Sequence, residues 1–225
     1  MRLPRRGLVA CTVALALLGC RDDGEADDTT TTTASTPGPS DTIAPDDPDL
    51  TPLLLTADDL PDGFAPNEDV DDTITAFCAG QDAAAGLSAS GRAIAGFTRT
   101  PPGASVIEVV FRFDGDGAEQ FVAQAEELLT SCSGVPDATG LAFTYEPLSA
   151  PVAATLDGAD ASASRFGTSV GSGNLTVEIA VIQHDDLGAL IAVLGLEEPR
   201  ADLDALAQTA FSSAVAMLAQ PTRSD

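Results

Sequence analysis

The sequence predicts an α+β domain with a central, mostly antiparallel sheet of about six strands and two long helices packed on one face. Three observations predict this class. Several segments alternate apolar and polar side chains, which is typical of strands with one buried face. Two long segments repeat apolar residues at helical spacing. The connections between strands are short enough for hairpins, which join antiparallel neighbours.

The predicted elements follow the order α-β-β-α-β-β-β-β-α within residues 50–225. Thr56 caps a short first helix that carries Asp58 and Asp59 in its first turn, and Pro61 ends it. The last strand is apolar on both faces, so we place it in the centre of the sheet. The strands are expected at residues 92–100, 106–113, 141–145, 160–170, 175–181 and 188–194.

The strand at 106–113 shows the clearest alternation, because Glu108 and Arg112 face away from a row of apolar side chains. The first long helix follows Asp116, and its apolar stripe reaches Cys132. The second runs from Pro199 or Arg200 to about Leu218, with proline in its first turn.

Residues 1–19 are typical of an export signal. Three arginines precede an apolar run, Gly7–Leu18, which is too short to span a bilayer comfortably because spanning needs about 20 residues. The run ends in Leu17-Leu18-Gly19-Cys20, which resembles the lipobox of bacterial lipoproteins. We therefore predict cleavage after Gly19 and acylation of Cys20, which anchors the protein on the extracytoplasmic face of the membrane. The alternative is an ordinary cleavage site beside an unrelated cysteine.

Residues 20–49 are predicted to form a disordered tether. They are rich in Asp, Thr and Pro and carry almost no apolar side chain, so they bury too little surface to offset the entropy lost on folding. Residues 50–225 have the length of one domain.

The formal net charge of −25 argues against nucleic acid as a partner and against direct binding to an anionic lipid surface. A solvated acidic surface with no partner explains the same charge.

Cysteine usage fits an exported protein. Cys11 lies in the leader and Cys20 is the lipid site, which leaves Cys78 and Cys132 as an even pair outside the cytoplasm. A bridge between them closes a loop of about 50 residues, which the chain-entropy model credits with about 4 kcal/mol. Cys132 lies on the predicted buried face of its helix, where it could join the helix to the segment that holds Cys78.

The sequence predicts no catalytic residue, no metal site and no cofactor. His184 lies in a predicted turn between two strands, where a solvated role explains it better than Ser-His catalysis. Asp114 and Asp116 begin like a calcium loop, but the later ligand positions hold Ala118 and Ala125, so helix capping explains these acids better.

A cationic groove is a hypothesis that the arginines support. Arg92, Arg99, Arg112 and Arg165 all lie in predicted strands, and on one sheet face they could hold a carboxylate or phosphate ligand. The alternative is cross-strand pairing with Glu108, Glu146 and Glu178.

The opening Leu-Leu-Thr-Ala-Asp-Asp-Leu-Pro, then Cys78, a strand and an amphipathic helix that ends at Cys132 together resemble the PknH-like extracellular domain. This family of sensor-type domains occurs in actinobacterial lipoproteins and on receptor kinases. The resemblance covers about residues 50–220 and implies an antiparallel α+β domain with a groove for an unidentified ligand. It also implies disulfides. Family members often have two, whereas the mature chain has cysteines for one.

We therefore expect a cell-surface lipoprotein with a non-catalytic sensor or ligand-binding domain that takes a small molecule or a protein. The alternative is a lipid-carrying or protein-docking structural lipoprotein of the cell envelope. A lipid carrier needs a long apolar cavity, whereas a sensor needs a smaller cleft with polar groups.

Overall fold

The computed structural model describes residues 47–70, 76–77, 81–100, 103–131, 133–134, 142–157, 159–171, 173–196 and 199–220. The predicted leader, most of the predicted tether with Cys20, and both Cys78 and Cys132 lie outside these residues. The predicted lipid anchor and disulfide therefore stay predictions.

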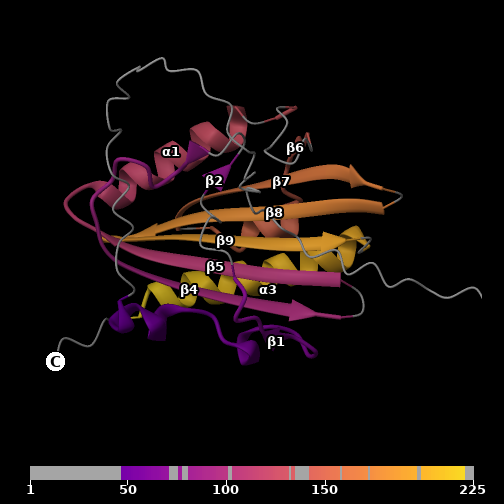
Figure 1. The fold of residues 1–225 in the computed structure, drawn as a ribbon, viewed down its shortest axis with the longest axis horizontal. Coiled ribbons are helices and arrows are strands. Elements are labelled where there is room, and N and C mark those ends of the chain that lie inside the picture. Colours follow the sequence, from indigo (N-terminus) through magenta and orange to yellow (C-terminus); the bar gives the residue numbers. More distant parts are fainter. Residues whose placement is uncertain are drawn as a thin grey trace, which may run out of the picture.

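One antiparallel sheet organises the described domain (Figure 1). It has seven strands in the order β1-β4-β5-β9-β8-β7-β6, and a separate two-stranded sheet pairs β2 with β3. The predicted antiparallel α+β class is confirmed. The strand bounds are β1 Ala65–Pro66, β2 Ala76–Phe77, β3 Gln81–Asp82, β4 Ala89–Arg99, β5 Gly103–Phe113, β6 Thr144–Pro147, β7 Asp160–Val170, β8 Gly173–His184 and β9 Leu187–Leu196.

The middle of the sheet is β9, as its composition predicts. It pairs with β5 along one side and with β8 along the other. Its residues from Leu187 to Val193 are all buried, because apolar layers cover both faces of the sheet at this strand. An apolar run with no polar alternation is the sequence mark of such a position.

The helices are α1 (Gly117–Ser131), the short α2 (Ala150–Ala154) and α3 (Arg200–Leu218), preceded along the chain by two 3-10 helices, η1 (Pro48–Leu53) and η2 (Ala57–Asp59). Thr56 and Asp59 form the expected cap of η2, where Asp59 Oδ2 accepts from Thr56 N at 2.8 Å and from Thr56 Oγ1 at 2.7 Å. Within the described ranges, no helix is long and apolar enough to cross a bilayer.

The two long helices lie on opposite faces of the sheet, so the prediction that both pack on one face is wrong. Phe121 and Leu129 of α1 belong to one apolar cluster with Val109 and Phe111 of β5. The stripe of α3 belongs to another, with Val106 and Val110 of the same strand. In Figure 1, α3 passes behind the strands. Both faces of β5 therefore need cover, and each helix supplies it for one face.

The segment from residue 47 to residue 60, which we call the N-terminal strap, runs along β4 on the α3 side (indigo in Figure 1). Its leucines enter the same apolar cluster as α3. The chain then forms β1, where Ala65 pairs with Thr98 and Pro66 with Phe97. Next, Asn67 N donates to Gly96 O at 2.8 Å, and Val70 lies against Gly96. The strap and the residues after it therefore wrap β4, with β1 as the outermost strand on this side of the sheet.

Candidate functional site

Charged side chains lie inside the layer between the sheet and α3. The sequence predicts that Glu108 and Arg112 lie on an exposed face of β5. Glu108 is instead fully buried, because α3 and the strap cover that face. Arg165 and Glu178, in β7 and β8, are buried in the same layer. Among the described residues, the buried charged side chains therefore all lie in this layer.

Arg165 holds two carboxylates from different elements. Its Nε donates to Glu178 Oε1 at 2.7 Å, and its Nη2 contacts both Glu178 Oε1 and Asp204 Oδ1. Arg165 and Glu178 lie directly opposite each other across β7 and β8, and Asp204 comes from the first turns of α3. The network therefore ties α3 to the sheet. Of the three glutamates in the cross-strand alternative, Glu178 pairs with a strand arginine, as that alternative predicts. Glu108 instead accepts from Leu55 N, and Glu146 pairs with Arg200 of α3 at 3.3 Å.

Burial raises the pKa of Glu178, and the nearby Asp204 raises it further, while hydrogen bonding and the charge of Arg165 lower it. Glu178 Oε2 and Arg165 Nη1 are buried and have no hydrogen-bond partner in the described structure. The sequence could identify Arg165 and Glu178 as strand charges, but no local pattern links them to Asp204, which is 39 residues from Arg165.

Glu108 has a different environment. Its Oε2 accepts a hydrogen bond from Leu55 N at 2.6 Å, and its Oε1 is buried with no hydrogen-bond partner in the part of the chain that the structure describes. Desolvation raises the pKa of Glu108 to about 8. The carboxyl therefore keeps its proton at neutral pH. It is the buried acceptor to which the strap is hydrogen-bonded.

The structure does not bring the predicted groove arginines together. Arg112 Nη1 pairs with Asp47 Oδ2 at 2.7 Å on the α3 side of the sheet. Arg92 pairs with Phe111 in register, on the α1 side. Arg165 of β7 is held by its two carboxylates, and strands β9 and β8 lie between it and Arg112 of β5. Arg99 lies over the ring of Phe64, 5.0 Å from its centroid.

A row of apolar side chains crosses the α1 face near one end of the sheet. Leu194, Val177, Phe166 and Tyr145 are register partners in β9, β8, β7 and β6, and we call them the apolar row. Tyr145 and Phe166 meet edge to face, with ring centroids 5.7 Å apart. Phe166 is buried, but the other three side chains are half-buried.

Leu196 extends this apolar surface toward solvent. It lies two residues beyond Leu194 on the same face of β9, and it is 36% exposed. Ile107 of β5 is half-buried on that face as well. The surface therefore offers apolar contact area at the end of the sheet, bordered by the hydroxyl groups of Ser105 and Thr168.

Two open hollows of about 600 Å³ each flank the first residues of β7. One, between α2 and β7, is lined mainly by alanines together with Leu156 and Asp157. The other, between α1 and β7, is acidic, with Glu119, Glu126 and Asp160 among its lining residues.

The remaining sequence candidates lie at turns. His184 is 45% exposed beside the β8–β9 turn, as a solvated turn residue would be, and its Nε2 lies 3.7 Å from Asp185 Oδ2. Asp114 and Asp116 precede α1, where Asp116 O accepts from Gln120 N at 3.1 Å. In the ranges that the structure covers, no three His, Cys, Asp or Glu side chains are placed to hold a metal ion.

Comparison with solved structures identifies the fold. The crystal structure of the extracellular domain of PknH from Mycobacterium tuberculosis is similar, with a TM-score of 0.50 and 16% identity, over 73% of this chain and 93% of that chain. A mutant of protein Mog1 matches with a TM-score of 0.34 and 14% identity, over 70% of this chain and 82% of that chain. No family model and no curated protein matches. The domain therefore shares the fold of the PknH extracellular domain, as the sequence resemblance implies.

Proposed function

We propose that the protein is a lipoprotein of the extracytoplasmic membrane face, whose folded domain binds a ligand and catalyses no reaction. The lipobox at Cys20 supports the anchor. The shared fold with an extracellular domain supports the location of the domain outside the cytoplasm. The one His of the sequence, His184, is 45% exposed beside a turn, so it gives no support for Ser-His catalysis.

The apolar row is the observation that carries the binding proposal. Half-buried apolar side chains from neighbouring strands form one surface in a strongly acidic molecule. Sites that bind ligands combine such surfaces with a small number of polar groups, and hydroxyl side chains border this one. The row is open at Leu196, so it suits a ligand or a partner that stays partly in water. This openness favours a sensor or docking surface over a carrier that encloses a lipid chain.

A thermal-shift experiment tests the binding surface on the full chain. The probes are decanoate, a short-chain phosphatidylglycerol, an apolar tripeptide and a disaccharide. We expect at least one apolar probe to raise the melting temperature of the wild type and to lose this effect in Leu196→Asp and Val177→Thr. Thr144→Asp is the matched control, because Thr144 is exposed on the neighbouring edge strand β6. Equal shifts in all four proteins, or no shift with any probe, would contradict the proposed surface.

The anchor has a separate test. Cys20→Ala should abolish metabolic palmitate labelling and release the protein from membranes, because only the thiol can form the thioether. Ser35→Ala, in the same predicted tether, is the control and should stay labelled. Undiminished labelling of Cys20→Ala would overturn the anchor and leave the binding proposal to be judged by the thermal shifts.

A further inference from the structure

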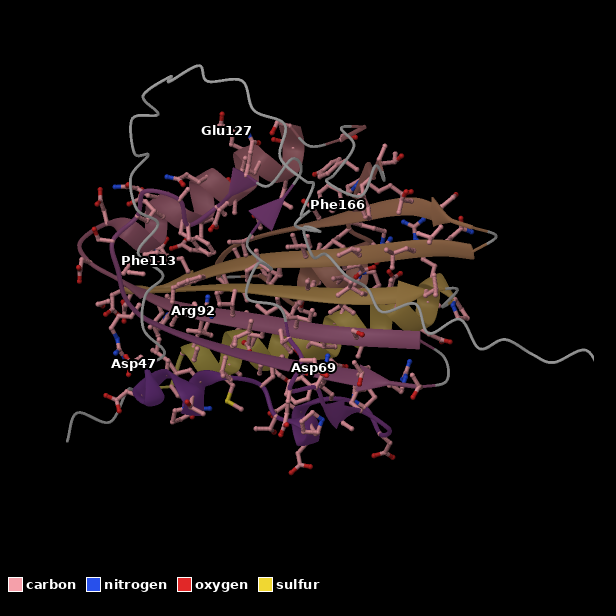
Figure 2. The ribbon with its side chains drawn as sticks, in the orientation of Figure 1. Asp47, Asp69, Arg92, Phe113, Glu127 and Phe166 are labelled. Atoms are coloured by element: carbon pink, nitrogen blue, oxygen red, sulfur yellow. The ribbon has the colours of Figure 1, made fainter. Side chains whose placement is uncertain are left out.

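Polar contacts attach the N-terminal strap to the sheet at its start and again near its middle. At its start, Asp47 N donates to Arg92 O at 2.8 Å, and Asp47 Oδ2 pairs with Arg112 Nη1 at 2.7 Å. Figure 2 places Asp47 beside the end of β4 that carries Arg92. Farther along, Leu55 N donates to Glu108 Oε2 at 2.6 Å. The strap therefore bridges the end of the tether and the interior of the sheet.

Apolar side chains hold the strap along its length. They pack in the cluster that α3 forms with β5 and β9, so the strap is part of the core on this side of the sheet. Its buried leucines are Leu50, Leu53, Leu54, Leu55 and Leu60. Asp59 O also lies 3.5 Å from Ser213 Oγ of α3, which closes the strap over Glu108.

The carboxyl group of Glu108, which accepts the hydrogen bond from the strap, is not reached by solvent. Among the described residues, Glu108 Oε1 has no hydrogen-bond partner, and it has no solvent contact, so a negative charge on this group is poorly compensated. Desolvation raises the pKa of Glu108, Asp59 raises it further, and the Leu55 hydrogen bond lowers it.

The other charged groups near this face do not donate a hydrogen bond to Glu108 Oε1 in the described structure, so they do not replace water around a charged Glu108. The buried stripe of α3 is apolar and β9 contains no ionisable residue. Charged groups do lie on the elements that share the face: Asp47 and Asp49 at the start of the strap, Asp58 and Asp59 of η2, Arg99 of β4, Arg112 of β5, Arg165 of β7, Glu178 of β8 and Asp204 of α3. Arg112 is paired with Asp47, and Glu178 with Arg165.

We propose that the strap is a proton-linked latch, docked on the sheet while Glu108 is neutral and displaced toward an open form when Glu108 becomes charged. In the open form water reaches the carboxylate. The docked form therefore binds one more proton, at Glu108, than the open form does. Rising pH therefore shifts the population toward the open form. The strap that opens is the segment through which the predicted tether joins the domain.

The sign and size of the effect follow from proton linkage. In the open form the carboxyl has an ordinary pKa near 4.5, whereas in the docked form its pKa is about 8. The equilibrium constant for opening therefore rises by up to about tenfold per pH unit between these two values and levels off above the higher one. Below the lower value, both forms are protonated and the population does not depend on pH.

Hydrogen–deuterium exchange measured by mass spectrometry on the full chain tests the latch. Protection factors, corrected for the intrinsic exchange rate, are followed in a strap peptide (residues 50–60) and in a β9 peptide (residues 187–196). We expect the strap peptide to be less protected than the β9 peptide. Its protection should fall by up to about tenfold per pH unit between 4.5 and about 8.

Glu108→Gln removes the titrating group while keeping an acceptor for Leu55 N, so the dependence on pH should vanish in the strap. Glu127→Gln is the matched control, because Glu127 is exposed on α1 and should leave the wild-type dependence unchanged. Two results would overturn the latch. One is a strap peptide whose amide protection equals that of the β9 peptide at every pH, a result that can be measured on the wild type alone. The other is an undiminished pH dependence in Glu108→Gln.

Discussion

Arg165 and Glu178 face each other across β7 and β8 with both side chains buried, and Arg165 Nε donates to Glu178 Oε1 at 2.7 Å. Asp204 brings a second carboxylate from α3 to the same guanidinium group. The pair is therefore also a point at which α3 is attached to the sheet through charge, and Arg200 of α3 makes a second, exposed ion pair with Glu146 of β6 at 3.3 Å.

Replacing Arg165 tests this attachment. Arg165→Met leaves two carboxylates in the layer without a counter-charge, and we expect it to lower the free energy of unfolding by about 3–5 kcal/mol. The double variant Arg165→Met/Glu178→Leu should recover part of this loss, because an apolar pair avoids the uncompensated charge. Urea unfolding measures both. A single variant as stable as the wild type would show that the network adds nothing to stability.

The stability of the domain should decrease as pH rises through the neutral range. The pKa of Glu108 is 4.5 in the unfolded chain and about 8 in the folded one, so its favourable contribution is complete below 4.5 and is lost progressively up to about 8. Each pH unit in this window costs at most about 1.4 kcal/mol for one group.

Urea midpoints of wild type and Glu108→Gln, measured at matched pH, isolate this effect from the other carboxylates. The difference between the two proteins should grow with pH in favour of the variant. A constant difference across the window would contradict the raised pKa.

Gly188 of β9 lies in a strand, and close packing rather than a turn explains why glycine occupies this position. A Cβ atom at this position would lie 2.9 Å from both Phe113 Cε2 and Phe121 Cδ1. Gly188→Ala should therefore destabilise the domain by about 1–3 kcal/mol through overpacking of the aromatic cluster. Gly167→Ala is the matched control in β7, where a Cβ atom meets no described atom within 4 Å. Thermal unfolding that ranks the two variants equally would contradict this account.

The predicted bridge between Cys78 and Cys132 can be tested directly. Non-reducing peptide mapping of the exported protein should recover the two cysteines in one linked peptide. Cys78→Ser/Cys132→Ser should then lose up to about 4 kcal/mol of stability. Reduction of the wild type should produce a similar loss, whereas two free thiols in the exported protein would refute the bridge.

Much of the secondary structure could be predicted because periodicity is strong in this chain. β7 spans the predicted residues 160–170, and α3 ends at Leu218 as its apolar stripe indicates. The sequence does not reveal β1, because two residues are too short to show alternation and Pro66 argues against a strand. It does not reveal α2 for a similar reason, since five residues cannot show a full helical repeat.

The arrangement around the candidate site could not be predicted in the same way. A period of two shows which side chains share a face, but Glu108 and Arg112 resemble a solvated face until α3 and the strap are placed over them. The partners that explain the buried charges are remote in sequence. Leu55 is 53 residues from Glu108, and no local rule joins them. The apolar row is hidden for the same reason, because its members come from four separate strands.

The outer strands of the sheet affect how neighbouring copies can meet. β1 ends in Pro66 and β6 ends in Pro147, and each is short, so neither provides a long row of free amide and carbonyl groups. Along β4, the carbonyls of Arg92 and Gly96 already accept hydrogen bonds from Asp47 and Asn67. Under the proposed lipid anchor, copies of the protein would be concentrated at one membrane surface, which favours intermolecular strand pairing wherever an edge is open. Blocked edges of this kind protect a crowded population from aggregating through its sheets.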